Sequence, residues 1–134
     1  MPIATEHLIS DASELLHRNA HPDFIQNGRI SSQVFKLKTA DKGQLSVQQN
    51  SKAIAAIAYA RYTARDFESA GVWSVTVAEC SELSLKAYDD PLPDDDSHAV
   101  LDLTRFTTSQ AHKLADKLAH KARARGCQYS PPAK

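Results

Sequence analysis

The segment GVWSVTVAEC, residues 71–80, constrains the fold of this chain more than any other part of the sequence. Its side chains alternate between two faces: Val72, Ser74, Thr76 and Ala78 on one, and Trp73, Val75, Val77 and Glu79 on the other. A period of two, with β-branched and aromatic residues, is typical of a β-strand. We therefore predict a strand over 72–79, which must belong to a sheet that is covered by another layer.

Hydrophobic spacing and turn residues assign the remaining elements. Helical spacing predicts three helices, within 4–19 and ending before His21-Pro22, over 51–67, and from Thr107 or Thr108 to Gly126. Further strands are expected at 34–37 and 44–48, forming a hairpin through a turn at 41–43, at 83–88, antiparallel to 72–79, and at 98–103. Asn27-Gly28 predicts another turn. The order α-β-β-α-β-β-β-α indicates an α+β fold, a mainly antiparallel sheet with helices packed on it.

Length and composition predict a single domain. A chain of 134 residues, 42% hydrophobic and 24% charged, can bury a core without disulfide or metal support. We expect the domain to cover residues 1–126 and residues 127–134 to form a flexible tail. The isolated Cys80 and Cys127, and a sequence without a signal peptide or membrane-spanning stretch, indicate a soluble cytoplasmic protein.

Glycine and charge counts exclude several functional classes. The four glycines are too widely spaced for a P-loop or a dinucleotide-binding fingerprint. Sixteen Lys and Arg residues balance 16 Asp and Glu residues, so no global basic field gathers nucleic acid. We expect no cofactor and no metal.

Four scattered polar residues form the candidate catalytic group: His21, Arg29, Ser32 and His98. Two histidines can supply a general acid and a general base, while an arginine stabilises a phosphoryl or carboxylate charge. Metal-independent ribonucleases and phosphotransfer enzymes need this equipment. The same residues can also serve structural roles, such as bonding the carbonyls at a helix end or following a turn.

Two charged segments are candidate partner-binding surfaces. The loop at 89–97 carries Asp94, Asp95 and Asp96, and is expected to be exposed, where it could bind a basic partner or shield a basic helix. The last predicted helix carries Lys113, Lys117 and Lys121 at steps of four, continued by Arg123 and Arg125, a stripe that could contact nucleic acid phosphates. His112, Asp116 and His120 on the same helix form a partial zinc-site pattern.

Two functions follow from these observations. The first is a non-catalytic protein-interaction or accessory module that binds a protein partner or forms a homodimer. The alternative is a metal-independent ribonuclease or phosphotransfer enzyme that uses His21, Arg29 and His98. Convergence of these side chains in space would favour the enzyme.

Overall fold

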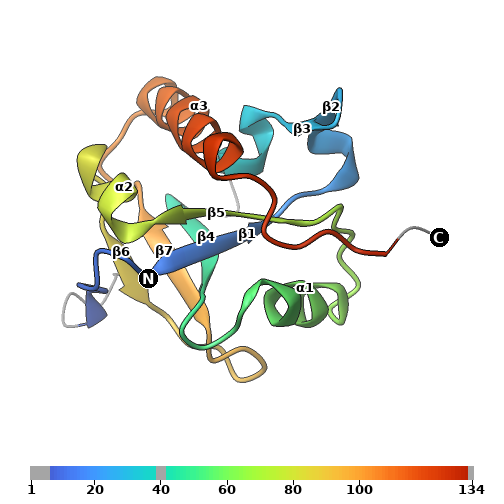
Figure 1. Cartoon of the computed structure of the whole chain (residues 1–134). Helices are drawn as coiled ribbons and strands as arrows, with labels where there is room; N and C mark the ends of the chain where they lie inside the picture. The colour runs from blue at the N-terminus through green and yellow to red at the C-terminus, as the bar shows by residue number, and fades with distance from the viewer. Residues whose placement is uncertain (1–6, 39–41, 133–134) are drawn as a thin grey trace.

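The fold centres on a five-stranded antiparallel sheet. The computed structural model describes residues 7–38 and 42–132. The strand order is β5-β1-β4-β7-β6, with bounds β1 Leu15–Asn19, β4 Gln44–Gln49, β5 Val72–Thr76, β6 Ala87–Asp89 and β7 His98–Asp102. Figure 1 shows α3 on one side of this sheet and α1 on the other. The predicted α+β class, with an antiparallel sheet and helices packed on it, is confirmed.

The smaller elements fill in around the sheet. Helix α1 (Ala55–Thr63) packs on β1 and β5, whereas α3 (Thr108–Arg125) packs on β5 and on the 3-10 helix η3 (Ser32–Phe35). The others are the 3-10 helix η2 (Pro22–Phe24), the hairpin strands β2 (Ile25–Gln26) and β3 (Arg29–Ile30), and helix α2 (Val77–Glu82). Among the described residues, none of these helices combines the length and apolarity that a membrane crossing requires.

The helix expected within 4–19 is wrong, because its described part contains strand β1. Leu16 faces the hydrophobic core. His17 and Asn19, which alternate with it and point to the opposite face of the strand, are also buried. Both faces of this strand are covered, so it lacks the polar alternation that marks a half-exposed strand. Residues 4–6 of the predicted helix lie outside the described residues.

The strand expected at 34–37 is also wrong. Val34 and Phe35 are buried in η3, and β4 pairs with β1 and β7 rather than with this segment. Asp41, in the turn predicted for that hairpin, lies outside the described residues. The predicted Asn27-Gly28 turn is confirmed: it joins β2 to β3 with φ angles of 53° and 76°.

The alternating segment at 72–79 divides into a strand and a helix. Thr76 ends β5 and caps α2: its hydroxyl accepts a hydrogen bond from the Glu79 amide at 3.1 Å, and the Glu79 carboxylate accepts one from the Thr76 amide at 2.8 Å. This capping box marks the start of a helix, so the alternation that continues to residue 79 does not extend the strand. β5 and β6 then lie at opposite edges of the sheet, so the predicted pairing of 72–79 with 83–88 is wrong.

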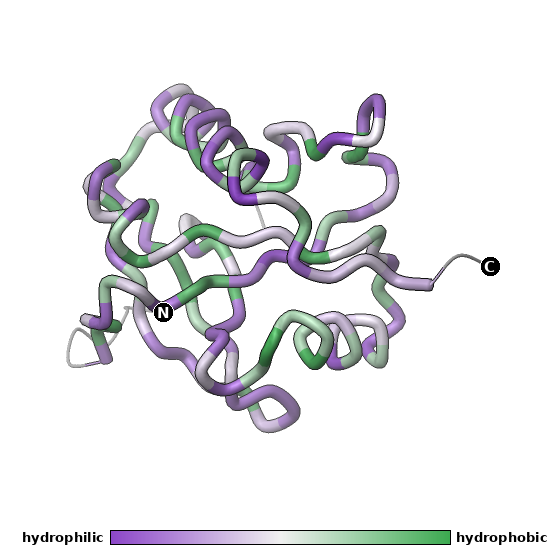
Figure 2. The backbone as a smooth tube through the Cα atoms, in the orientation of Figure 1, coloured by the Kyte–Doolittle hydropathy of each residue, from purple (hydrophilic) through white to green (hydrophobic). Residues whose placement is uncertain are grey.

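The core lies between the sheet and α3. Helix α3 has the predicted apolar stripe, with Ala111, Leu114, Ala115, Leu118 and Ala122 all buried. Figure 2 shows this pattern as short hydrophobic segments that interrupt an otherwise hydrophilic helix. Gly126 ends α3 with a positive φ of 94°, as expected for a residue after a helix C-terminus.

Segments of the chain itself flank both edges of the sheet. Next to β6, the Ile9 amide donates to the Ala87 carbonyl at 2.9 Å. Next to β5, the Val72 amide donates to the Tyr129 carbonyl at 2.9 Å, and the Gln128 amide to the Val72 carbonyl at 2.8 Å. The start of the segment expected as a tail is therefore hydrogen-bonded to the sheet.

Candidate functional site

A cleft of about 530 Å³ lies on the side of the sheet that faces α1. Its floor includes β1, β4 and the first residue of β7. One wall is α1 and the loop after it, and another comes from the η2 and η3 region. The volume falls within the range of about 300–1,000 Å³ typical of small-molecule sites.

Five cationic side chains contribute to the lining of this cleft. They are Arg18, Lys36, Lys38, Arg61 and Arg65. The carboxylates that line it are those of Glu68 and Asp95. These side chains leave a local excess of positive charge, part of which the neighbouring Asp94 and Asp96 offset, and the remainder favours an anionic ligand.

Ser46, His98 and Asp90 form a hydrogen-bonded chain at the cleft. The Nε2 atom of His98 lies 3.1 Å from the Ser46 hydroxyl oxygen. On the other side of the ring, Nδ1 lies 2.8 Å from the Asp90 carbonyl oxygen and 3.2 Å from the Asp90 carboxylate. Since a carbonyl can only accept, Nδ1 carries the proton and Nε2 is free to accept the serine proton. This is the arrangement of a nucleophile, a base and an orienting carboxylate.

The register of the sheet brings these residues together. Ser46 pairs with Val100 and Gln48 with His98, so Ser46 and His98 lie diagonally on the same face of neighbouring strands. Asp90 follows β6, and its amide donates to the His98 carbonyl at 3.0 Å. Ser46 is exposed between the buried Leu45 and Val47. In the sequence it is an ordinary polar position of a strand, and without strand order nothing pairs it with His98.

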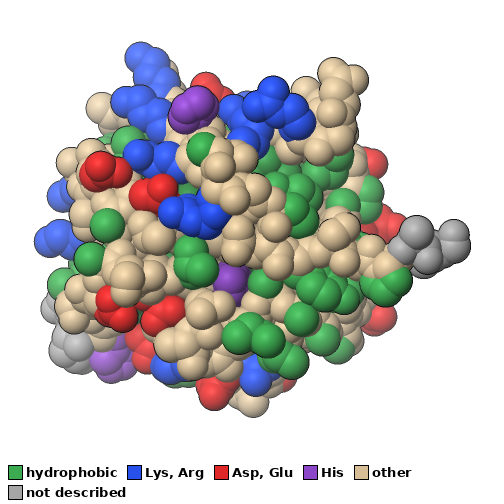
Figure 3. Space-filling view, viewed as in Figure 1, with side chains coloured by type: hydrophobic (Ala, Val, Ile, Leu, Met, Phe, Trp, Pro, Cys, Tyr) green, Lys and Arg blue, Asp and Glu red, His purple; other side chains and the backbone are tan. Residues whose placement is uncertain are grey.

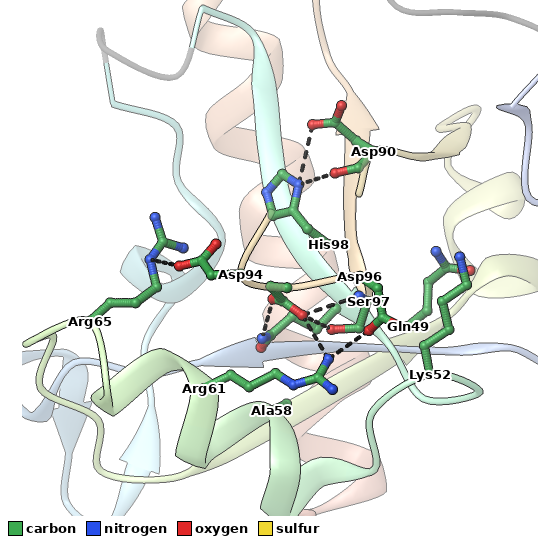
Figure 4. A network of polar contacts seen from close by, with 12 residues as sticks. Gln49, Lys52, Ala58, Arg61, Arg65, Asp90, Asp94, Asp96, Ser97 and His98 are labelled. Carbon is green, nitrogen blue, oxygen red and sulfur yellow. Dashed lines mark hydrogen bonds and ion pairs between the residues drawn. The ribbon is translucent and has the colours of Figure 1, made fainter. Parts of the chain in front are cut away.

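The aspartate loop forms one boundary of the cleft through contacts with α1 (Figure 4). The Arg61 guanidinium donates to the Asp95 carboxylate at 3.0 Å and to that of Asp96 at 2.8 Å. Asp95 is 4% exposed, so the expectation that the whole loop is exposed is wrong at this residue. Burial alone would raise the pKa of Asp95, but hydrogen bonds from Ser97, Gln48 and Arg61 together lower it below 3.8.

The neighbouring aspartates stay at the surface. The Asp96 and Asp94 side chains are 71% and 60% exposed, and Asp94 lies 3.7 Å from the Arg65 guanidinium. Figure 4 shows Arg61, from α1, and Arg65, from the turn after it, reaching toward the loop. The loop thus shields cations of α1 and its following turn, not those of the C-terminal helix.

Two pairs of rings also line the cleft. The Tyr62 and Phe67 rings stack with centroids 5.1 Å apart, and the Arg65 guanidinium lies 5.5 Å from the Phe67 centroid. The His21 and Phe24 rings lie 5.7 Å apart. His21 Nε2 is 3.0 Å from the carboxylate of Glu68. Because Glu68 directly follows Phe67 in the sequence, this contact connects the two ring pairs.

The structure separates the predicted catalytic residues into two groups. His21 and His98 both line the cleft, whereas Arg29 and Ser32 are not among its lining residues. Arg29 lies exposed in β3, and Ser32 begins η3. Arg18, Arg61 and Arg65 occupy the cleft instead. Both ring nitrogens of His21 are engaged, because Nδ1 accepts from the Asp23 amide at 3.0 Å and Nε2 contacts Glu68.

A third histidine, His17, borders the cleft but is buried. His17 is 1% exposed, and its ring contacts the Ser74 hydroxyl at 2.6 Å and the Asn50 side-chain oxygen at 3.0 Å. Burial lowers the pKa of His17, against the opposing effects of the Asn50 hydrogen bond and the Glu14 charge. This histidine is therefore neutral near pH 7.

Three cations of the basic stripe on α3 bind neighbouring parts of the protein and so attach the helix to the rest of the fold. Lys121 lies 3.0 Å from the Glu82 carboxylate, Arg125 2.7 Å from that of Glu79, and Arg123 donates to the Ile30 carbonyl at 2.9 Å. Lys113 and Lys117 are exposed. Figure 3 shows Lys and Arg side chains gathered over α3 on the face viewed.

The zinc pattern on α3 is not completed by the fold. His112, Asp116 and His120 are exposed on α3. Within residues 7–38 and 42–132, no three His, Cys, Asp or Glu side chains are grouped closely enough to hold a metal ion.

Comparison with known proteins gives no independent indication of function. No protein-family model, curated protein or solved structure matches this chain.

Proposed function

We propose that this protein is a metal-independent phosphotransfer enzyme that uses Ser46 as its nucleophile. The observation that carries the proposal is the Ser46–His98–Asp90 chain at the edge of a cleft lined by lysines and arginines. A phosphate ester suits this cleft because its negative charge is balanced by those cations. The proposal retains His98 from the sequence prediction and replaces Arg29 and Ser32 with Arg61 and Ser46.

The chemistry divides into two displacements at phosphorus. The Ser46 oxygen forms a bond to phosphorus while the bond to the leaving oxygen breaks, and His98 Nε2 takes the serine proton. The Asp90 carboxylate stabilises the resulting imidazolium, which then gives its proton to the leaving oxygen. In the second step water or an acceptor alcohol attacks the phosphorus of the phosphoserine and loses a proton to His98. The bond between the Ser46 oxygen and phosphorus breaks, and His98 returns the proton to the Ser46 oxygen, which regenerates both residues.

A fluorophosphonate probe tests for the activated serine without knowledge of the substrate. The Ser46 oxygen attacks the probe's phosphorus, fluoride leaves, and the serine proton passes to His98. We expect intact-mass and peptide spectra to show one adduct, on Ser46, that forms equally well in EDTA. His98→Ala should reduce the labelling rate by about 10²–10⁴-fold, the usual contribution of a general base.

Matched variants keep this test specific. Ser46→Ala should abolish labelling, whereas Ser51→Ala, at another exposed serine, should leave it unchanged. Because the labelling is read per folded molecule, circular dichroism on each variant excludes unfolding as the cause. Unlabelled Ser46 in the folded wild-type protein, or equal labelling of the His98→Ala variant, would contradict the proposal.

The second candidate is a protein-interaction module located in the cytoplasm. Ile54 and Ile57 at the start of α1 are 59% and 43% exposed, which favours contact with a protein partner or a second copy of the chain. Asp94, Asp96, Lys113 and Lys117 would provide charged contacts. The free thiols of Cys80 and Cys127 suit a reducing compartment. Native mass spectrometry of the wild-type and Ile54→Ser/Ile57→Ser proteins tests the homodimer directly.

A further inference from the structure

The Tyr62–Phe67 ring pair lies beside the cations of the cleft and has no evident role in the proposed phosphotransfer chemistry. Phe67 is 48% exposed, although a phenyl ring is stabilised by burial. The Phe67 ring stacks on Tyr62, and the Arg65 guanidinium lies over the same ring, 5.5 Å from its centroid. A ring that is held in place, exposed and inside a cleft is suited to stacking on a flat ligand.

The positions of charge and rings along one segment define the ligand further. Arg61 lies on α1 and Arg65 in the turn that follows it, and Tyr62 and Phe67 lie close to them in sequence and in the cleft. A ligand that uses both features must join an anionic group to a planar ring over a short distance. The cleft volume of about 530 Å³ suits a single such unit rather than an extended chain.

We infer that the substrate is a nucleoside phosphate whose base stacks on the Tyr62–Phe67 pair while its phosphate contacts Arg61 and Arg65. This inference rests on the proposed function, because it names the phosphate ester on which Ser46 acts. Aromatic stacking accepts any base, since every base has a π-face. Recognition of the base is therefore expected to be tolerant of its identity.

The test compares adenosine 5′-monophosphate with ribose 5-phosphate, which lacks the base but keeps the sugar and the phosphate. Both dissociation constants are measured by calorimetry on protein carrying Ser46→Ala, which prevents turnover. Stacking of one base is expected to make the nucleotide bind about 5- to 150-fold more tightly than the sugar phosphate. Phe67→Ala, added to this protein, should remove that difference and leave the affinity for ribose 5-phosphate unchanged.

Phe106→Ala is the matched control. Phe106 also lies under an arginine, with the Arg105 guanidinium 5.3 Å from its centroid, but it lies outside the cleft. This variant should keep the full preference for the nucleotide. Phe67→Leu, which preserves apolar volume without a flat ring, should behave like Phe67→Ala and keeps the test valid if the alanine variant unfolds.

The outcomes separate this inference from the proposed function. Equal affinities for the two ligands in the Ser46→Ala protein would overturn the nucleotide assignment and leave the phosphotransfer proposal standing. The same conclusion would follow if neither ligand bound to the Ser46→Ala protein while the fluorophosphonate labelled Ser46 of the wild-type protein. A preference that survives Phe67→Ala and Phe67→Leu would overturn the stacking site.

Discussion

His17 and His98 make similar hydrogen bonds but differ in access to solvent. Each ring contacts a serine hydroxyl on one side and an oxygen acceptor on the other. His17 is 1% exposed and its serine, Ser74, is fully buried, so no substrate reaches them. Ser46 is exposed at the cleft. Accessibility, rather than hydrogen-bonding pattern, therefore identifies His98 as the candidate base.

The buried His17 should make stability depend on pH. Its folded pKa is lower than the unfolded value of about 6.5, so the unfolded state binds more protons as the pH falls below 6.5. The stability contributed by neutral His17 is complete above pH 6.5 and is lost as the pH falls toward the folded pKa. We expect His17→Gln to cost about 1–3 kcal/mol at pH 7.5, since it disturbs the buried bond to Ser74.

Urea unfolding of both proteins between pH 5 and 8 measures this effect. The stability difference between the wild type and His17→Gln should shrink as the pH falls from 7.5 to 5. This range lies above the titration of Asp95, whose pKa is lowered below 3.8. A difference that stays constant over the whole range would show that His17 does not titrate as proposed.

Individual residues of the site were predictable to different degrees. His21 and His98 could be selected because histidines at element ends are common in functional sites. Ser46 and Asp90 could not, because their importance comes from a contact across 52 residues and from a loop that folds back on His98. That information lies in the pairing of β4 with β7, which hydrophobic periodicity does not contain.

At the level of elements, the loop between β6 and β7 acts as a partner of α1. Asp95 is buried and anchors the loop through Ser97, Gln48 and Arg61. The exposed Asp94 and Asp96 instead hold the outer positions on Arg65 and Arg61. These two carboxylates occupy donor groups that an anionic ligand would also use.

Removal of the two exposed carboxylates should strengthen anion binding. Exposed ion pairs are worth up to about 1 kcal/mol each, so Asp94→Asn/Asp96→Asn should tighten the binding of inorganic phosphate by up to about fivefold for each pair. Calorimetric titration with phosphate measures the change. Asp116→Asn, at an exposed carboxylate on α3, is the control and should leave affinity as it is. Unchanged or weaker binding by the double variant would argue against competition.

Some elements were predicted closely and others were not. The helix at 51–67, the strand at 98–103 and the last helix each contain the observed element, and the strand at 44–48 matches β4 to within one residue. The last helix was predictable because its polar face is distinct from its buried stripe. Strand β1 is covered on both faces, and η3 is stabilised by tertiary contacts with α3, so local pattern misled in both places.

At the scale of the molecule, Trp73 belongs to the core shared by the sheet and α3. It lies in β5 and is 9% exposed. Trp73→Ala should reduce the free energy of unfolding by about 3–5 kcal/mol through lost burial and a residual cavity. Urea denaturation gives the value, with Phe67→Ala at a half-exposed ring as the comparison. A loss below 1 kcal/mol would mean that Trp73 contributes little to this core.

The hydrogen bonds at residues 9 and 129 have a consequence for assembly. Exposed edge strands allow other chains to join by β-augmentation, which leads to strand-mediated dimers or aggregates. Here the Ile9–Ala87 and Val72–Tyr129 contacts place the chain's own backbone where an incoming strand would pair. Association that extends the five-stranded sheet at these positions would therefore require one of these segments to detach first.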